Sequence, residues 1–282
     1  MQNNDISIPD VLNDSTKDLN NVFKVSGTDE DEPILPDSDY YTETEFTDLI
    51  ITKKISDDQS LSILSINIAN LFSKLSNFKI FIDNISTPEN KPGIICVVET
   101  HISQNEKTGY NHEELTNILP GYKFYYTGRK TKKGGGVGIF VIDRLSEDIE
   151  TGIGFSGDKH FVDEVFESVS IKIPHLIKNG HNCVGKNLIV IALYRQPGNS
   201  NTETFLQKLE KWISTVDKRN NEIVITGDTN LDLLKHETHL PTATYLDMLM
   251  SHKLLPRIVR PTRIKHKSAT LIDHFFTRDN DI

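Results

Sequence analysis

The feature that most constrains the fold is a series of short apolar runs between residues 61 and 276, most of which end at a polar residue. Runs of this length, rich in β-branched and aromatic residues, are typical of strands. We expect strands over 61–67, 94–99, 122–128, 136–142, 166–173, 188–194, 222–228 and 270–276. Apolar residues at helical spacing predict helices over 71–85, 202–218 and about 242–252, the first capped by Asn70. Helices interrupt a larger number of strands, so we expect an α/β (α+β) fold in which helices flank two sheets.

The N-terminal segment differs in composition from the rest of the chain. Residues 1–58 carry 15 Asp and Glu against 4 Lys and Arg, whereas residues 59–282 carry 25 against 27. A segment without sustained periodicity cannot bury enough apolar surface to offset the entropy lost on ordering. We therefore expect residues 1–58 to be disordered and residues 59–282 to form the folded domain. The acidic segment either solvates a linker or mimics nucleic acid, and both interpretations stay open.

Cysteine content and the N-terminal residues bear on the cellular compartment. Two cysteines, Cys96 and Cys183, are too few for a disulfide framework or a four-cysteine zinc site. The opening residues, MQNNDISIPD, lack the cationic and apolar regions of a signal peptide. No apolar run approaches the roughly 18 residues of a transmembrane helix. We therefore expect an intracellular protein, in the nucleus or the cytoplasm, that is not secreted and has no membrane partner.

Polar side chains stand at the ends of several predicted strands, and a sandwich brings such ends to one rim. Each has an ordinary alternative, for example an Asx turn for Asp228 and Asn230, or a local ion pair for Asp273. Their shared position at strand ends predicts a single site instead. Its members are Asn67, Glu99, Tyr194, Asp228, Asn230 and Asp273.

These residue types suit metal-assisted cleavage of a phosphodiester. A Mg²⁺ or Mn²⁺ ion held by one or two carboxylates neutralises charge on the phosphate. Glu99 can be that ligand, helped by the amide oxygen of Asn67. Asp228 can align or deprotonate the attacking water, and Asn230 faces the same way on an extended backbone. Tyr194 can donate a hydrogen bond to a phosphoryl oxygen.

Six strings occur in one order over about 60–278: LSILSINIANL, VVETHI, KKGGGVGIFV, ALYRQPG, ITGDTNLDLL and RPTRIKHKSATLIDHFFT. They resemble the endonuclease/exonuclease/phosphatase superfamily, which includes deoxyribonuclease I and the apurinic/apyrimidinic endonucleases. Within it they are most similar to the endonuclease domain of non-LTR (LINE-type) retrotransposons. The resemblance implies a four-layer sandwich of two mixed β-sheets flanked by helices, and a divalent-metal nuclease that nicks target DNA. A full-length element of this kind would add a reverse transcriptase domain.

The resemblance also implies a role for each residue of the predicted site. It assigns the metal site to Asn67 and Glu99, and catalytic positions to Tyr194, Asp228, Asn230, Asp273 and, less directly, Thr262. In this scheme Asp273 matches the acid that orients a catalytic histidine.

The chain departs from the family pattern in several places. Ala69 stands where repair-type members often have an acid, His101 where retrotransposon-type members usually have Trp, and Thr229 where Phe is usual. A Ser-Asp-His element and a final strand are expected beyond the strand at 270–276, and the sequence ends at Ile282 without them. We therefore expect the sandwich to lack its final strand. His274 is not expected to substitute, because successive side chains on a strand point to opposite faces.

The missing histidine bears on activity. Losing one preorganised transition-state donor costs on the order of 10²–10³ in rate. We therefore expect this chain to bind DNA weakly, in a salt-sensitive way, and to nick it at or near background.

A basic stretch over 251–278 and the lysines before the triglycine indicate where DNA would lie, since phosphate contacts dominate affinity for nucleic acid. Solvated loops are the alternative explanation. The candidate DNA-backbone contacts are Lys132, Lys133, Arg260, Arg263, Lys265 and Lys267. Two other function classes stay open: a catalytically inactive nucleic-acid-binding module with the same fold, and a phosphatase of the same superfamily.

Overall fold

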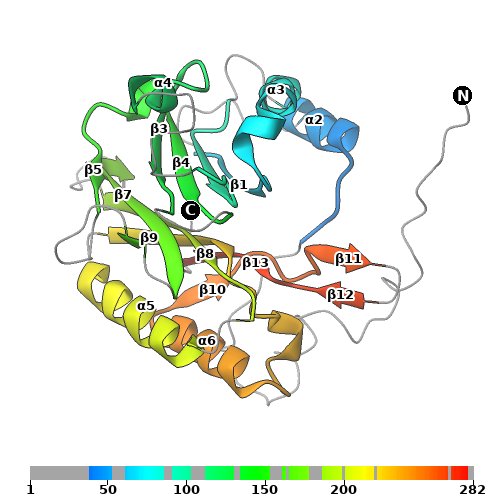
Figure 1. The fold of residues 1–282 in the computed structure, drawn as a ribbon, viewed down its shortest axis with the longest axis vertical. Coiled ribbons are helices and arrows are strands. Elements are labelled where there is room, and N and C mark those ends of the chain that lie inside the picture. Colours follow the sequence, from blue (N-terminus) through cyan, green and yellow to red (C-terminus); the bar gives the residue numbers. More distant parts are fainter. Residues whose placement is uncertain are drawn as a thin grey trace, which may run out of the picture.

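The computed structural model describes residues 38–52, 61–85, 91–102, 112–129, 134–152, 161–162, 165–177, 186–198, 201–218, 221–265 and 268–278. Two β-sheets lie face to face and helices cover their outer faces, so that four layers are stacked (Figure 1). This arrangement is the flanked two-sheet sandwich that the sequence predicts. Within the described ranges, every helix is too short or too polar to span a lipid bilayer.

The first sheet has four strands among the described residues, in the order β1-β2-β4-β3. β1 and β2 run parallel, and β4 is antiparallel to both of its neighbours. The central strands β2 and β4 are almost entirely buried, as expected for strands covered on both faces. The strands are β1 (Ile63–Asn67), β2 (Ile94–Val98), β3 (Tyr122–Thr127) and β4 (Val137–Ile142).

The second sheet follows the order β10-β13-β9-β8-β7-β5, with β6 also paired to β7. β8 and β9 are parallel, whereas β13 is antiparallel to β9. A separate hairpin, β11–β12, projects beside β13 (Figure 1). The strands are β5 (Glu150–Thr151), β6 (Phe161–Val162), β7 (Phe166–Ile177), β8 (Lys186–Arg195), β9 (Asn221–Asp228), β10 (Leu254–Pro256), β11 (Arg263–Lys265), β12 (Ser268–Thr270) and β13 (Asp273–Arg278).

Three apolar clusters hold the layers together. One lies between α3, α4 and the first sheet, a second lies between the two sheets, and a third, which includes the fully buried Trp212, lies between the second sheet and α5 and α6. Asn70 caps α3 as predicted, because its side chain accepts a hydrogen bond from the N–H of Ser73. The helices are α2 (Glu43–Thr52), α3 (Leu71–Asn84), α4 (His112–Thr116), α5 (Thr202–Val216) and α6 (Leu240–Ser251), with 3₁₀ turns η3 (Asp143–Leu145) and η4 (Leu233–Lys235).

The last predicted strand begins later than expected. Thr270 pairs with Arg263 in the β11–β12 hairpin, and β13 starts only at Asp273. Leu271 lies between them, where its N–H binds the carboxylate of Asp232 (2.9 Å) instead of a neighbouring strand. The hydrogen bond to Asp232, which is distant in sequence, therefore breaks the apolar run that was predicted as a single strand over 270–276.

Part of the segment expected to be disordered forms structure. Within residues 38–52, helix α2 begins with a capping box, in which the N–H of Thr42 donates to Glu45 (2.7 Å) and the N–H of Glu45 donates to the Thr42 hydroxyl (3.2 Å). Phe46 packs against the cluster between α3 and the first sheet. The folded part of this chain thus extends N-terminal to residue 58, while residues 1–37 and 53–58 lie outside the described ranges.

Candidate active site

The predicted site residues meet at one end of the sandwich. Asn67 is the last residue of β1, Glu99 follows β2 directly, and Asp228 ends β9. Within the second sheet, Asp228 is the register partner of Tyr194 on β8 and of Asp273 on β13. The parallel pairing of β8 with β9 and the antiparallel pairing of β13 with β9 therefore bring three polar residues side by side.

Asn67 connects the two sheets at this end. Its side-chain nitrogen donates to Glu99 Oε1 (2.9 Å) and to Asp228 Oδ2 (3.2 Å). Its side-chain oxygen accepts the N–H of Ala69 (3.2 Å). Asn67 therefore holds two carboxylates from different sheets in place, and it would have to turn its amide over to offer the oxygen to a metal ion.

Asn230 fixes the position of Asp228. Its N–H donates to Asp228 Oδ1 (2.9 Å), and its side chain donates to the carbonyl of Arg195 at the end of β8 (2.7 Å). The backbone of Asn230 is left-handed (φ 51°) and not extended as expected, and asparagine tolerates this conformation better than most residues. Both oxygens of Asp228 thus accept a hydrogen bond, and its carboxylate is held at a defined angle.

Burial and like charges perturb the acids of the site. Desolvation raises the pKa of Asp228 to about 7, and the nearby charges of Asp273 and Glu99 add to the shift. Burial also raises the pKa of Asp273; Glu99 adds to that shift, whereas a hydrogen bond from Thr262 opposes it. Ionisation of both aspartates is therefore disfavoured, and a cation bound beside them would stabilise their charged forms.

Tyr194 presents a hydroxyl that stays protonated. Burial raises its pKa, and the charges of Glu99 and Asp228 raise it further. The side chain is almost wholly buried at the edge of the inter-sheet cluster. Its O–H is therefore available as a hydrogen-bond donor at any physiological pH.

Comparison with known proteins identifies the family of this chain. Residues 63–282 match the endonuclease/exonuclease/phosphatase family. The chain belongs to that family. No curated protein sequence matches the chain.

Solved structures share the fold of this family member at low sequence identity. The apurinic/apyrimidinic endonuclease LMAP from Leishmania major superposes with a TM-score of 0.58 at 12% identity, over 90% of this chain and 88% of that one. A 3′ phosphatase from Neisseria bound to a product DNA hairpin gives 0.54 at 14%, over 78% and 87%. An AP endonuclease from Archaeoglobus fulgidus gives 0.50 at 18%, over 77% and 86%.

In this family member, Thr262 anchors the strand that carries Asp273. Its hydroxyl accepts the N–H groups of Ile272 (3.4 Å) and Asp273 (3.2 Å). Thr262 thus lies at the site, where it supports the backbone at the start of β13.

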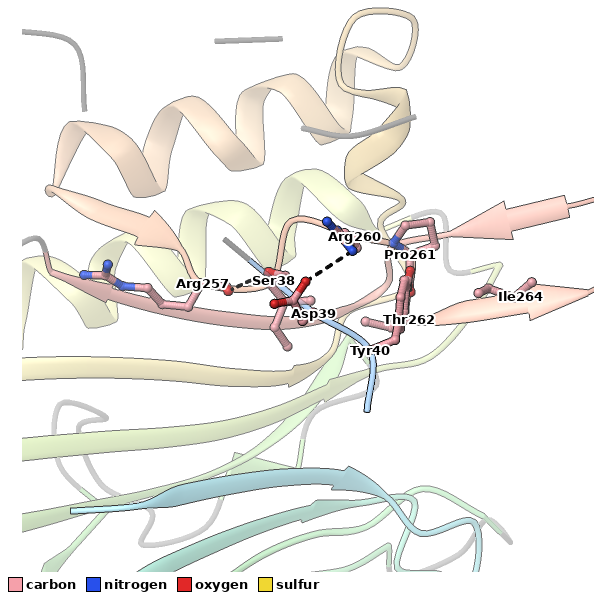
Figure 2. A pocket seen from close by; sticks show the side chains of 9 residues that line it. Ser38, Asp39, Tyr40, Arg257, Arg260, Pro261, Thr262 and Ile264 are labelled. Carbon is pink, nitrogen blue, oxygen red and sulfur yellow. Dashed lines mark hydrogen bonds and ion pairs between the residues drawn. The ribbon is translucent and has the colours of Figure 1, made fainter. Parts of the chain in front are cut away.

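A pocket beside Thr262 is walled partly by the N-terminal segment, which the sequence analysis left out of the site (Figure 2). Ser38 bridges the carbonyl of Arg257 (3.1 Å) and the N–H of Val259 (3.0 Å), and the hydroxyl of Tyr40 donates to Pro261 (2.8 Å). The capping box at the start of α2 is the sequence signal that could have predicted structure there.

Of the candidate DNA contacts, those that the structure describes lie on the same side of the molecule as this pocket. Arg260 is 41% exposed and pairs with Asp39 (3.5 Å). Arg263 and Lys265 are exposed on β11. Lys132, Lys133 and Lys267 lie outside the described residues.

His274 points away from the site, as predicted. The ring lies on the opposite face of β13, stacked on Tyr245, and Nε2 contacts the carbonyl of Leu271 (3.1 Å). Thr229 places its hydroxyl 3.1 Å from His274 Nδ1. This histidine is therefore part of the packing between β13 and α6.

The site fits a cation that keeps most of its waters. No group of three or more His, Cys, Asp and Glu side chains in the described ranges is arranged to enclose a metal ion. Mg²⁺ does not require such a cage, since it is usually bound through one or two carboxylates and several waters. Glu99 suits this role, because Asn67 holds its Oε1, its Oε2 lies 4.0 Å from Nε2 of His101, and its side chain is 26% exposed.

Proposed function

We propose that this chain is a metal-dependent phosphodiester hydrolase that acts on DNA, of the kind found as the endonuclease domain of non-LTR retrotransposons. The observation that carries the proposal is the network in which Asn67 joins Glu99 and Asp228 across the two sheets. The solved structures with this fold include proteins named as AP endonucleases and a phosphatase bound to DNA, which supports DNA as the substrate. The retrotransposon assignment is supported by the sequence strings.

Asp228 is the residue that we assign to the attacking water. A general base works best when its pKa lies near the working pH, and burial together with neighbouring acids raises the pKa of Asp228 to about 7. Asn230 and Asn67 hold its two oxygens, so the carboxylate does not need to reorient during the reaction. The hydroxyl of Tyr194 would donate a hydrogen bond to a phosphoryl oxygen.

Glu99 is the residue that we assign to Mg²⁺ or Mn²⁺, with Asn67 holding its other oxygen. When bound, such an ion supplies positive charge that offsets the charge developing on the phosphate. Asp273 completes the cluster of acids, and Thr262 supports it from the neighbouring loop.

DNA would reach the site past Arg260 and the exposed side chains of β11. Arg260, Arg263 and Lys265 offer positive charge there, and Lys132, Lys133 and Lys267 are further candidates from the sequence. Binding through phosphate contacts weakens steeply with salt. We therefore expect affinity for DNA to fall as the salt concentration rises.

A plasmid-nicking assay with Mg²⁺ tests the proposal. We compare the unmodified chain with Asp228→Ala, and use Asp247→Ala as a matched control because Asp247 is exposed on α6, away from the site. Loss of a general base costs about 10²–10⁴ in rate, so Asp228→Ala should lose nicking while Asp247→Ala keeps it.

The same assay separates the other functions. Salt-sensitive DNA binding without nicking that depends on Asp228 would indicate the inactive DNA-binding module. Hydrolysis of a small phosphate monoester in preference to DNA would indicate a phosphatase.

A further inference from the structure

A buried ion pair lies next to the segment that carries Glu99. Glu167 on β7 is 2% exposed, and its Oε1 accepts a hydrogen bond from Nε of Arg129 (2.5 Å). Its other oxygen accepts the backbone N–H of Gly136 (2.5 Å). A charged group so deeply buried is costly unless each oxygen has a partner, and here one partner is the glycine loop of residues 134–136.

The glycine loop fits closely against this pair. Gly135 and Gly136 both have left-handed backbones (φ 70° and 86°). A Cβ on Gly135 would lie 2.4 Å from Glu167 Oε1, and a Cβ on Gly136 would lie 2.3 Å from the hydroxyl of Thr100. The loop is therefore seated directly between the ion pair and the end of β2, and only glycine allows this approach.

The loop in turn holds the backbone that follows Glu99. The carbonyl of Gly136 accepts the N–H of Thr100 (3.1 Å), and the carbonyl of Gly135 accepts the N–H of His101 (2.7 Å). On the other side, the carbonyl of Glu99 accepts the N–H of Asn70 (2.7 Å). Glu99 is thus clamped between the glycine loop and the start of α3.

This clamp is needed because the backbone of Glu99 is strained. Its φ of 55° lies in the left-handed region, which is unfavourable for a residue with a Cβ. Such a conformation persists only where the surrounding hydrogen bonds impose it. It also sets the direction in which the Glu99 side chain leaves the chain.

We propose that Glu167 is a positioning residue for the cation site: through the glycine loop it holds Glu99 in the conformation that binds the metal ion. The inference rests on the proposed function, because it takes Glu99 as the metal ligand. The side chain of Glu167→Gln has one acceptor oxygen, whereas two donors must be satisfied. The variant would therefore lose the hydrogen bond from either Arg129 or Gly136. Changes beyond the ligands themselves weaken metal binding by about 10–100-fold, and we expect at least about 10-fold here.

The test is a Mn²⁺ titration followed by electron paramagnetic resonance, which measures free Mn²⁺ directly and does not depend on activity. Glu167→Gln is compared with Glu222→Gln, a matched control on β9. Glu222 is also buried (3% exposed) and paired with a cation, Lys186, in the same sheet. It lies six residues before Asp228, roughly 20 Å along the strand. Glu99→Gln identifies the binding that belongs to the site.

The inference predicts weaker Mn²⁺ binding in Glu167→Gln and unchanged binding in Glu222→Gln, with both variants folded by circular dichroism. If Glu167→Gln does not fold, Gly135→Ala tests the same link from the loop, and it should also bind Mn²⁺ more weakly. The positioning role is overturned if folded Glu167→Gln binds Mn²⁺ as tightly as the unmodified chain, or if both glutamine variants lose the same amount of Mn²⁺ affinity. Either result leaves the proposed function intact. If the unmodified chain binds no Mn²⁺ that depends on Glu99, the proposed function fails and this inference fails with it.

Discussion

His274 should make the stability of this protein depend on pH in a predictable direction. Its ring is 2% exposed, and Nε2 lies against the carbonyl of Leu271, which can only accept, so Nε2 carries the proton. Nδ1 then accepts from the hydroxyl of Thr229 or Tyr245. Burial lowers the pKa of His274 to about 4, because this pocket stabilises the neutral ring.

The size of the effect follows from the shift in pKa. An exposed histidine titrates near pH 6.5, whereas the folded state holds the pKa of His274 at about 4, and each tenfold change in proton affinity corresponds to about 1.4 kcal/mol. The unfolded chain binds the proton first as the pH falls. The contribution of His274 to the free energy of unfolding is therefore complete above about pH 6.5 and declines by roughly 3 kcal/mol as the pH drops to about 4.

The measurement must separate His274 from the acids of the site. Asp228 has a raised pKa in the folded state, so its contribution has the opposite sign: it is greatest at low pH and is lost as the pH rises through about 7. Urea denaturation of the unmodified chain and of His274→Asn, from about pH 7.5 to about pH 4.5, isolates the histidine, because the acids contribute equally to both. The variant should be less stable at neutral pH, and the gap should narrow in acid. A gap of constant size would show that the ring is not held neutral by burial.

Three further predictions concern the site and its supports. Nicking should increase with pH and level off above an inflection at or below about pH 7, because Asp228 must lose its proton to act as a base and a bound cation can only lower its pKa; a rate profile that is flat over this region would contradict the assignment. Gly227→Ala should lower the free energy of unfolding, measured by urea denaturation, by more than about 3 kcal/mol, because the new Cβ would lie 1.9 Å from the carbonyl oxygen of Leu193. Gly121 is also at positive φ but has open space around it, so Gly121→Ala should lower that free energy by only about 1–2 kcal/mol. Equal losses in the two variants would refute the clash. Ser38→Ala should lower the free energy of unfolding by about 1–2 kcal/mol because it leaves the N–H of Val259 without that acceptor, and an unchanged midpoint in a thermal melt would show that the N-terminal segment adds nothing to the domain.

Local sequence pattern predicted most of the elements because each is decided by periodicity over a few residues. The alternation in 61–67 corresponds to β1, and the helical spacing in 71–85 corresponds to α3, with ends shifted by one or two residues. The pattern did not predict where β13 begins, because the break depends on Asp232, which reaches Leu271 from a distant loop. It also did not predict α2, whose apolar contact through Phe46 requires the first sheet and α3 to be in place.

The identity of the chemical groups at the strand ends can be read from the sequence, because a residue's position in an apolar run is a local property. How those groups interact depends on the fold. The side-chain nitrogen of Asn67 faces the two carboxylates, and the pKa of Asp228 is raised, because strands from two different sheets end at the same edge. The same holds for Glu167. In the sequence it is an ordinary residue of a predicted strand, and it contacts the loop beside Glu99 only because β7 packs against the end of the first sheet. Charge, burial and hydrogen-bond geometry depend on neighbours that are far away along the chain, and no local pattern contains them.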